Sequence, residues 1–218
     1  MNLIKSTLSE QIYQILRSDI LNQTIHFGER LTLKNLQERF GVSSTPIREA
    51  LTRLSEEELV VYYSNVGVRV IEPQKEDLRE LYQFIGDLDA LAITYASASK
   101  RQEELIAQLR ENISQTAIDG LEHADDEKIR LWMEQSDRFH LIFYDYCDNM
   151  RLTRAAERLR SQMSIFSNLY EKDLQVQKEI EACHIGIFEA YEQGQYPLAA
   201  ERMRGHVMES LKFALERI

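Results

Sequence analysis

Cysteine is scarce in this chain of 218 residues: only Cys147 and Cys183 occur, and they do not form a CxxC pair. Two isolated cysteines provide neither a disulfide framework nor a zinc-type cysteine pair, so both are expected to be reduced thiols in a cytoplasmic protein. No apolar run is long enough to cross a bilayer, and the first residues are too weakly apolar for a signal peptide. We therefore expect no membrane partner.

Glycine and proline are also scarce, with eight and three residues in the whole chain. Since these residues interrupt regular structure, their scarcity predicts a mainly helical protein. Apolar residues at helical spacing predict an all-helical antiparallel bundle over residues 73–218. About six helices are expected there, near residues 74–98, 101–118, 126–147, 150–170, 176–193 and 196–217.

A surplus of basic residues is missing as well, and the net charge of −10 at first sight argues against a nucleic-acid partner. The charge is unevenly distributed, however. Residues 1–71 carry eight Lys/Arg and eight Asp/Glu, whereas residues 72–218 carry eighteen and twenty-eight. The acidic second part repels DNA, so only the first part can face a phosphate backbone. There the attraction must come from the local placement of cations.

Residues 1–72 show the order of a winged helix-turn-helix domain, in which three helices are followed by a β-hairpin wing. Apolar spacing predicts a first helix over about residues 5–22. Thr32 is expected to cap a second helix that Gly41 ends, and Ser43 or Ser44 is expected to cap the third. Two β-rich runs around a Ser-Asn-Val-Gly turn predict the hairpin, at residues 59–63 and 68–71.

Residues 40–54, Phe-Gly-Val-Ser-Ser-Thr-Pro-Ile-Arg-Glu-Ala-Leu-Thr-Arg-Leu, resemble the signature of the GntR family of transcription regulators. That signature reads Gly-Val-Ser-Arg-Thr-Pro-Val-Arg-Glu-Ala-Leu, and the chain matches it at nearly every position. Small hydroxyl residues at a helix start direct donors at phosphate, and an arginine one turn later can reach a base edge. The resemblance implies that double-stranded operator DNA is bound by Lys34, Ser43, Ser44, Thr45, Arg48 and the wing tip at Asn65 and Gly67.

Three positions depart from the family pattern. Ser44 and Val66 stand where the family usually or often has arginine, and Glu58 replaces a common glycine. The loss of two arginines is expected to lower the affinity for DNA or to change the sequence preference. Arg53 is expected either to reach the DNA backbone or to pair with Glu49 at i, i+4 spacing. The alternative for this unit is a winged helix that binds protein instead of DNA.

The second part of the chain resembles the FCD ligand-binding domain of the FadR-like branch of the same family. Residues 76–82 match its opening helix, residues 136–140 its Asp-x-x-Phe-His motif and residues 149–152 its Asn-Pro-x-Leu element. In many members of this branch, one aspartate and three histidines from separate helices hold a divalent metal ion. The histidine positions correspond to His140, His184 and His206.

The carboxylate of this implied metal site is altered. The aspartate position, four residues before His140, holds Ser136, while Asp137 lies three before it and has a different reach. Three neutral imidazoles with an open position suit zinc, nickel, copper or iron(II) better than magnesium or calcium. The alternative is that the three histidines are core residues hydrogen-bonded to their neighbours.

The resemblance also implies an effector pocket in the bundle. The family often has an arginine on the first bundle helix that binds an effector carboxylate, and Ile85 stands at that position. With aromatic residues abundant nearby, the effector is expected to be an organic acid or an aromatic metabolite, although such aromatics also suit a plain core. The predicted lining is Ile85, Asp89, Phe139, Phe143 and Asn149.

The whole chain is thus predicted to be a homodimeric, ligand-responsive transcription regulator and not an enzyme, with repression as the output that the resemblance favours. Two alternatives remain open. In one, the metal ion itself is the signal and no organic effector exists. In the other, the bundle is a di-iron enzyme, because Asp137-x-x-His140 and Glu181-x-x-His184 repeat a carboxylate-x-x-His motif. The enzyme needs two further glutamate ligands and leaves His206 without a role.

Overall fold

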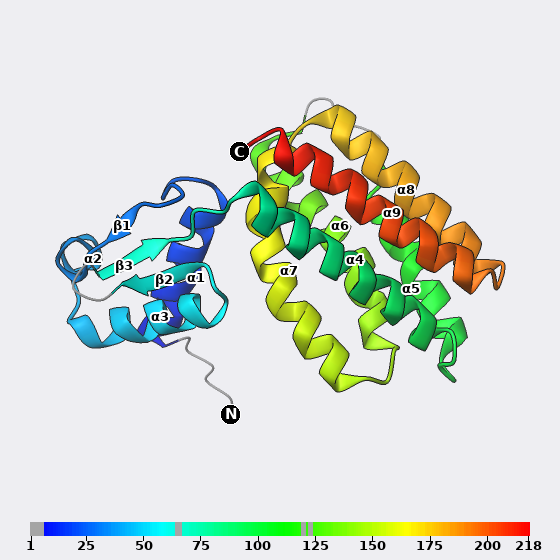
Figure 1. Ribbon diagram of the computed structural model, residues 1–218, viewed down its shortest axis with the longest axis horizontal. Coiled ribbons are helices and arrows are strands. Elements are labelled where there is room, and N and C mark those ends of the chain that lie inside the picture. Colours follow the sequence, from blue (N-terminus) through cyan, green and yellow to red (C-terminus); the bar gives the residue numbers. More distant parts are fainter. Residues whose placement is uncertain (1–6, 64–66, 119–120, 122–123) are drawn as a thin grey trace. The chain divides into compact units, whose positions relative to one another are not determined.

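The computed structural model describes residues 7–63, 67–118, 121 and 124–218. The chain divides into two compact units, Met1–Gln74 and Lys75–Ile218, each of which is described by itself. Figure 1 shows the elements of both units.

The first unit combines helices with a small antiparallel sheet in the order of a winged helix. The sheet has the strand order β1-β3-β2, so the hairpin strand β3 lies in the middle. Its elements are α1 (Leu8–Leu21), β1 (Arg30–Leu31), α2 (Leu33–Phe40), α3 (Ser44–Glu56), β2 (Val60–Tyr63) and β3 (Gly67–Val70). The fold class predicted from the sequence is confirmed, and β1 is an addition to it. A strand of two residues is too short to show a periodicity.

Local signals explain the ends of the short helices. The Thr32 hydroxyl accepts a hydrogen bond of 3.2 Å from the backbone N–H of Asn35, which caps α2 as predicted. Gly41 ends that helix in the left-handed conformation, with φ of 66°, where a side chain would be strained. Thr32 thus sets the start of α2, and Gly41 sets the tight turn between α2 and α3.

The core of this unit lies between α1 and α3. Leu16, Ile20, Ile47 and Leu54 are fully buried there. Because one face of α3 is committed to this core, its opposite face is left to solvent, and Arg48 lies on that exposed face. The unit therefore presents one side of its third helix to a partner.

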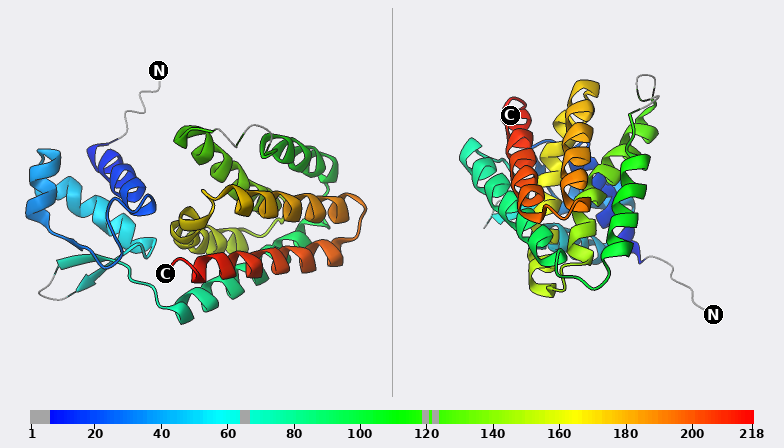
Figure 2. Two further views of the ribbon diagram at one scale, coloured as in Figure 1. Left: turned by 90° about the horizontal axis from the view of Figure 1, so that it is seen from above. Right: turned by 90° about the vertical axis from the view of Figure 1, so that its right-hand side faces the viewer.

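The second unit contains six helices in the part of the chain that the structure describes, as predicted. They are α4 (Lys75–Ala96), α5 (Gln102–Gln115), α6 (Asp126–Asp145), α7 (Met150–Tyr170), α8 (Leu174–Glu192) and α9 (Tyr196–Leu215). In both views of Figure 2, α9 runs between α4 and α8 and antiparallel to each of them. Among the described helices none is long and apolar enough to cross a membrane.

The bundle core is mainly apolar, and one group of charged and polar side chains is buried within it. Phe139, Phe143, Tyr191 and Met203 are among its fully buried members. Beside them the structure buries one aspartate, one arginine and three histidines, namely Asp89, Arg160, His140, His184 and His206. Since charged and polar side chains are costly to bury, this group stands out from the rest of the unit.

Candidate functional site

The N-terminal turn of α3 carries the predicted DNA-binding residues. Ser43 is the N-cap, but its hydroxyl makes no capping hydrogen bond. Thr45 and Arg48 are exposed on the first turns, and Ser44 is half-buried. The structure thus brings a free hydroxyl, exposed helix N–H groups and one arginine to the same end of the helix, an arrangement suited to phosphate and base edges.

The other predicted DNA contacts lie on neighbouring elements. The side chain of Lys34 on α2 is 85% exposed, and its Nζ lies 3.9 Å from Glu38 Oε1, a separation at which surface ion pairs contribute little. Gly67 begins β3 with φ of 103°, a conformation that favours glycine. Asn65 and Val66 lie outside the described residues.

Arg53 is held inside its own unit. Its guanidinium pairs with the carboxylate of Glu10 on α1 and lies 3.9 Å from the ring centroid of Tyr13. The predicted partner Glu49 is therefore not the one found. The helix α1 supplies both contacts, which places Arg53 in the packing of α1 against α3.

Glu58 shows what its departure from the family glycine means. Its φ is 57°, in the left-handed region where non-glycine residues carry a strain of order 1 kcal/mol. The turn between α3 and β2 therefore keeps the conformation that a glycine would favour. The glutamate therefore adds strain to this turn but leaves its backbone conformation unchanged.

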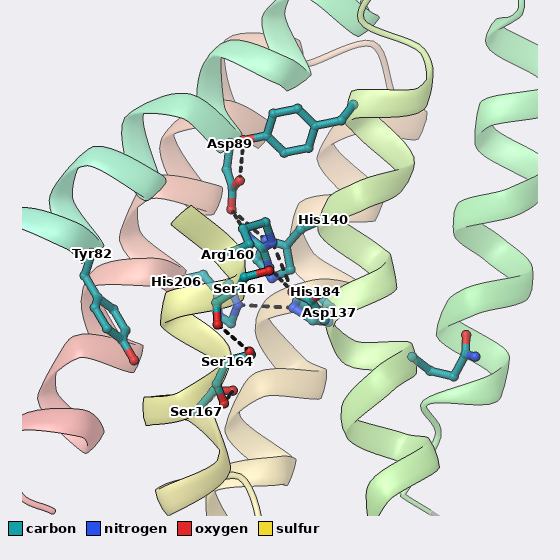
Figure 3. Close-up of polar contacts among 12 residues, drawn as sticks. Tyr82, Asp89, Asp137, His140, Arg160, Ser161, Ser164, Ser167, His184 and His206 are labelled. Carbon is teal, nitrogen blue, oxygen red and sulfur yellow. Dashed lines mark hydrogen bonds and ion pairs between the residues drawn. The ribbon is translucent and has the colours of Figure 1, made fainter. Parts of the chain in front are cut away.

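In the bundle, the three predicted histidines come together. His140, His184 and His206 lie on α6, α8 and α9, and one potential ligand atom from each lies within 4.8 Å of the others. The Nε2 atoms of His184 and His206 are 3.1 Å apart. The ring of Phe139 stacks on that of His184, with centroids 4.1 Å apart. Figure 3 shows these imidazoles facing one another in the bundle interior.

A buried carboxylate on α4 orients one of these imidazoles. Asp89 Oδ2 lies 2.8 Å from His140 Nδ1, and Asp89 Oδ1 accepts a hydrogen bond of 2.7 Å from the hydroxyl of Tyr144. An ionised carboxylate can only accept, so this network assigns the proton to Nδ1 of His140. The lone pair on His140 Nε2 is then left for another partner.

Arg160 on α7 adds a cation to the group. Its Nη1 donates to Asp89 Oδ2 over 2.8 Å, and its Nη2 donates to Asp137 Oδ1 over 2.6 Å. With one guanidinium against two carboxylates and three neutral imidazoles, the group carries a net charge of one negative. Sequence reasoning missed Arg160. The sequence signal that could have identified it is its spacing: Arg160 lies on the apolar face of α7, one turn after the buried Ala156 and one turn before the buried Met163.

Burial sets the protonation of the histidines. Burial, together with the Arg160 guanidinium, holds the pKa of His140 well below its usual range. Burial and the neighbouring histidines do the same for the pKa of His184, and burial lowers the pKa of His206 to about 4. For Arg160, burial alone would lower the pKa, but the carboxylates of Asp137 and Asp89 outweigh it and raise the pKa. All three imidazoles are neutral at pH 7.

The carboxylates predicted around the metal site are engaged elsewhere. Asp137 binds Arg160 and does not join the histidine cluster, because its position three residues before His140 turns it toward α7. Ser136 is buried on α6 but supplies no carboxylate. Glu181 accepts a hydrogen bond from the backbone N–H of Ile118. Both carboxylate-x-x-His motifs thus lack the carboxylate ligand that a di-iron site requires.

The predicted effector-pocket residues are only partly together. Asp89 and Phe139 contact the histidines. Ile85 is buried on α4, and Phe143 packs edge-on against Phe139 and Tyr191 in the core. Asn149 instead caps α7, where its Oδ1 accepts hydrogen bonds from the backbone N–H groups of Arg151 and Leu152. Asn149 therefore has a structural role at a helix end.

The histidine cluster fits a divalent transition metal. Ligand nitrogens about 2.0–2.1 Å from one ion lie about 3.0–3.4 Å from each other at cis or tetrahedral angles, and the two facing Nε2 atoms are 3.1 Å apart. With Nε2 of His184 as the ligand atom, its buried Nδ1 carries the ring proton and has no acceptor among the described residues, whereas His140 donates from Nδ1 to Asp89. The neutral imidazoles and the net negative charge of the group also suit a cation.

Comparison with known proteins decides the family. Residues 8–70 match the model of the bacterial regulatory proteins of the gntR family, and residues 80–209 match that of the FCD domain. The chain belongs to the GntR family. As a GntR regulator with an FCD domain it is a DNA-binding transcription regulator and not an enzyme, as predicted.

Individual GntR relatives resemble the chain over nearly its whole length. It is 28% identical to the HTH-type transcriptional regulator YdhC of Bacillus subtilis, over 94% of this chain and 92% of that one. It is 25% identical to the HTH-type transcriptional repressor RspR of Escherichia coli, over 93% and 86%. The solved structure of E. coli McbR/YncC superposes with a TM-score of 0.75 at 22% identity, over 96% and 98%, and shares the fold.

Proposed function

We propose that this GntR regulator is a cytoplasmic, homodimeric repressor whose FCD bundle binds a transition metal and, through it, a small organic effector. The observation that carries the proposal is the buried histidine cluster with its facing Nε2 atoms. For the effector to regulate, it must bind the DNA-competent and DNA-incompetent states unequally. The repressor output is supported by the name of the relative RspR.

In this proposal His140, His184 and His206 hold the ion, and Asp89 positions His140 by accepting a hydrogen bond from its Nδ1–H. Partners of this kind fix the ring orientation and raise the basicity of the ligand. A bound zinc, nickel, copper or iron(II) ion supplies positive charge and an open position for an effector oxygen or nitrogen. The aromatic ring of Phe139 covers one side of the cluster and limits the access of water.

The proposed DNA contacts lie at the start of α3 and on the elements beside it. They comprise Ser43, Thr45 and Arg48 at the start of α3, with Ser44 and Lys34 beside them and Gly67 in the wing. Arg53 is better explained by its contacts with Glu10 and Tyr13. Specificity in this set rests mainly on Arg48, because arginine can bond a guanine edge with two donors.

The homodimer is supported by an apolar stripe on α4. Phe84, Leu91 and Tyr95 are exposed there by 53%, 38% and 41%. Spacings of seven and four residues place them on one face of the helix. An apolar face of this kind is typical of a surface covered by another chain, and a second copy would bring two winged helices together for two half-sites.

Elemental analysis of untagged protein tests the metal. We expect about one zinc, nickel, copper or iron per chain, lost in His140→Ala, His184→Ala and His206→Ala. His26→Ala is the matched control, because His26 is exposed in the first unit. No metal after refilling with each of these ions would overturn the metal site, and two irons per chain would favour the enzyme alternative.

A specific observation favours one second candidate, in which the metal alone is the signal. Arg160 already binds two carboxylates, and Ile85 replaces the family arginine, so among the described residues of the bundle no buried cation is free for an effector carboxylate. Operator affinity measured with metal alone, and then with hydroxy acids or aromatic acids added, separates the two. If the metal ion changes the operator affinity and no added acid alters that affinity further, the protein is a metal sensor.

A further inference from the structure

A surface hollow of about 320 Å³ lies in the winged-helix unit where three of its parts meet. Arg30 and Thr32 line it from β1 and the start of α2, Arg48 from α3, and Tyr62 and Gly67 from the two wing strands. The predicted DNA contacts included Arg48 and Gly67 but not Arg30. The hollow therefore joins the recognition helix to the wing through a strand that has no assigned role.

The two arginines of the hollow differ from the other arginines of the same unit. Arg30 and Arg48 are both exposed, and within the described residues neither guanidinium has an ion pair or hydrogen bond. Three others are ion-paired, Arg17 with Glu57, Arg39 with Asp19 and Arg53 with Glu10. No acidic side chain is among the described residues that line the hollow. Two free guanidiniums without a carboxylate create a positive potential that fits an anion.

The side chain of Arg30 lies beside Gly67 of the wing. A Cβ atom placed on Gly67 would lie 3.9 Å from Arg30 Nε, so the guanidinium end of Arg30 passes beside the bare backbone of the wing. Strand pairing fixes this arrangement, because β1 pairs antiparallel with β3. Arg30 is thus held near the wing by the sheet and faces the same hollow as Arg48.

We propose that this hollow holds a phosphate of the DNA backbone and that Arg30 is a phosphate contact contributed by β1. A recognition helix lies in the major groove, and the sugar-phosphate backbone borders that groove. A cation between the helix and the wing therefore meets the backbone. Such a contact positions the domain and adds affinity for every sequence, whereas Arg48 can also read a base.

Salt-dependent fluorescence anisotropy tests this assignment with two probes: a random-sequence duplex of about 30 base pairs and a duplex selected for tight binding to the protein. Arg30→Gln is expected to weaken both by the same factor, roughly fivefold to tenfold near 0.1 M salt, and to reduce the salt slope by about 1. Arg48→Gln is expected to weaken the selected duplex more than the random one. Arg30→Lys keeps the charge and is expected to restore most of the slope.

The matched control is Arg17→Gln, which removes the same charge from the same unit but from an ion pair with Glu57, and which is expected to keep the wild-type slope. Thermal melting of Arg30→Gln at the wild-type temperature shows that the sheet is intact. An unchanged slope in Arg30→Gln would overturn the proposal, and so would a loss confined to the selected duplex. Binding of inorganic phosphate that releases DNA from the wild type and not from Arg30→Gln would instead make the hollow a regulatory anion site.

Discussion

Arg30 and Arg48 of the winged helix and Arg160 of the bundle occupy opposite environments. In the winged helix, Arg30 and Arg48 are exposed and have no ionic partner among the described residues. In the bundle, Arg160 is buried and bound to Asp89 and Asp137. An exposed free cation costs the fold little and is available to a partner that brings its own negative charge. A buried cation must be neutralised within the fold.

Arg30 and Arg48 are therefore expected to act in DNA binding, whereas Arg160 is expected to act in the stability of the bundle. Loss of Arg30 or Arg48 is expected to change affinity for DNA with little change in stability. Loss of Arg160 is expected to change stability first, because Asp89 would remain buried at 1% exposure without its counter-ion. The three histidines of the bundle are also buried, and burial keeps them neutral. Their protonation in acid is therefore expected to destabilise the bundle.

The largest expected effect is that of Arg160→Met. Breaking a buried ion pair by removing one partner costs about 3–5 kcal/mol, so the free energy of unfolding of the bundle should fall by that amount. Urea unfolding followed by Trp132 fluorescence measures it, since this tryptophan is the only one in the chain and lies on α6. Affinity of the folded variant for random duplex DNA should stay near the wild-type value.

The control for that substitution is Arg138→Gln. Arg138 pairs with Asp145 over 2.6 Å, but both side chains are at least 40% exposed, and such surface pairs contribute below about 1 kcal/mol. Equal stability of Arg160→Met and the wild type would contradict the view that the buried group needs this cation.

The next effect is a loss of bundle stability in acid. The folded pKa of His206 is about 4, below the unfolded value near 6.5. The unfolded state therefore takes up a proton that the folded state refuses, and stability falls as the pH drops below 6.5. Between pH 6.5 and 5, His206 alone accounts for about 2 kcal/mol, and His140 and His184 act in the same direction.

Urea unfolding of chelator-treated protein across this pH range measures the slope. His206→Gln should flatten it, and His26→Gln should not.

One group acts in the opposite direction: burial raises the pKa of Glu171 to about 8, so its protonation stabilises the folded state as the pH falls. Three histidines outweigh this half-buried carboxyl, and a stability that rises from pH 6.5 to 5 would show that the histidines are already charged.

Sequence patterns predicted the winged helix more completely than the histidine site for a physical reason. Caps and turns such as Thr32 and Gly41 act on neighbouring residues, so their structural effect is readable locally. The bundle cluster depends on side chains from five helices, and only its three histidines had a motif. The pairing of Asp89 with Arg160 spans 71 residues, and periodicity carries no signal for such a contact.

The smallest expected effect concerns Arg53, and it tests whether pairing in the free protein separates structural cations from DNA contacts. Arg53→Gln should keep the affinity for both duplexes within about twofold of the wild type, because its guanidinium is engaged by Glu10 and Tyr13. Anisotropy with the two duplexes measures this, with Arg48→Gln as the positive control.

A reduced salt slope in Arg53→Gln would mean that DNA displaces Glu10 from this arginine. The absence of a partner at Arg30 and Arg48 would then lose its value as a marker of DNA contact, and the assignment of Arg30 would depend on its place in the hollow alone.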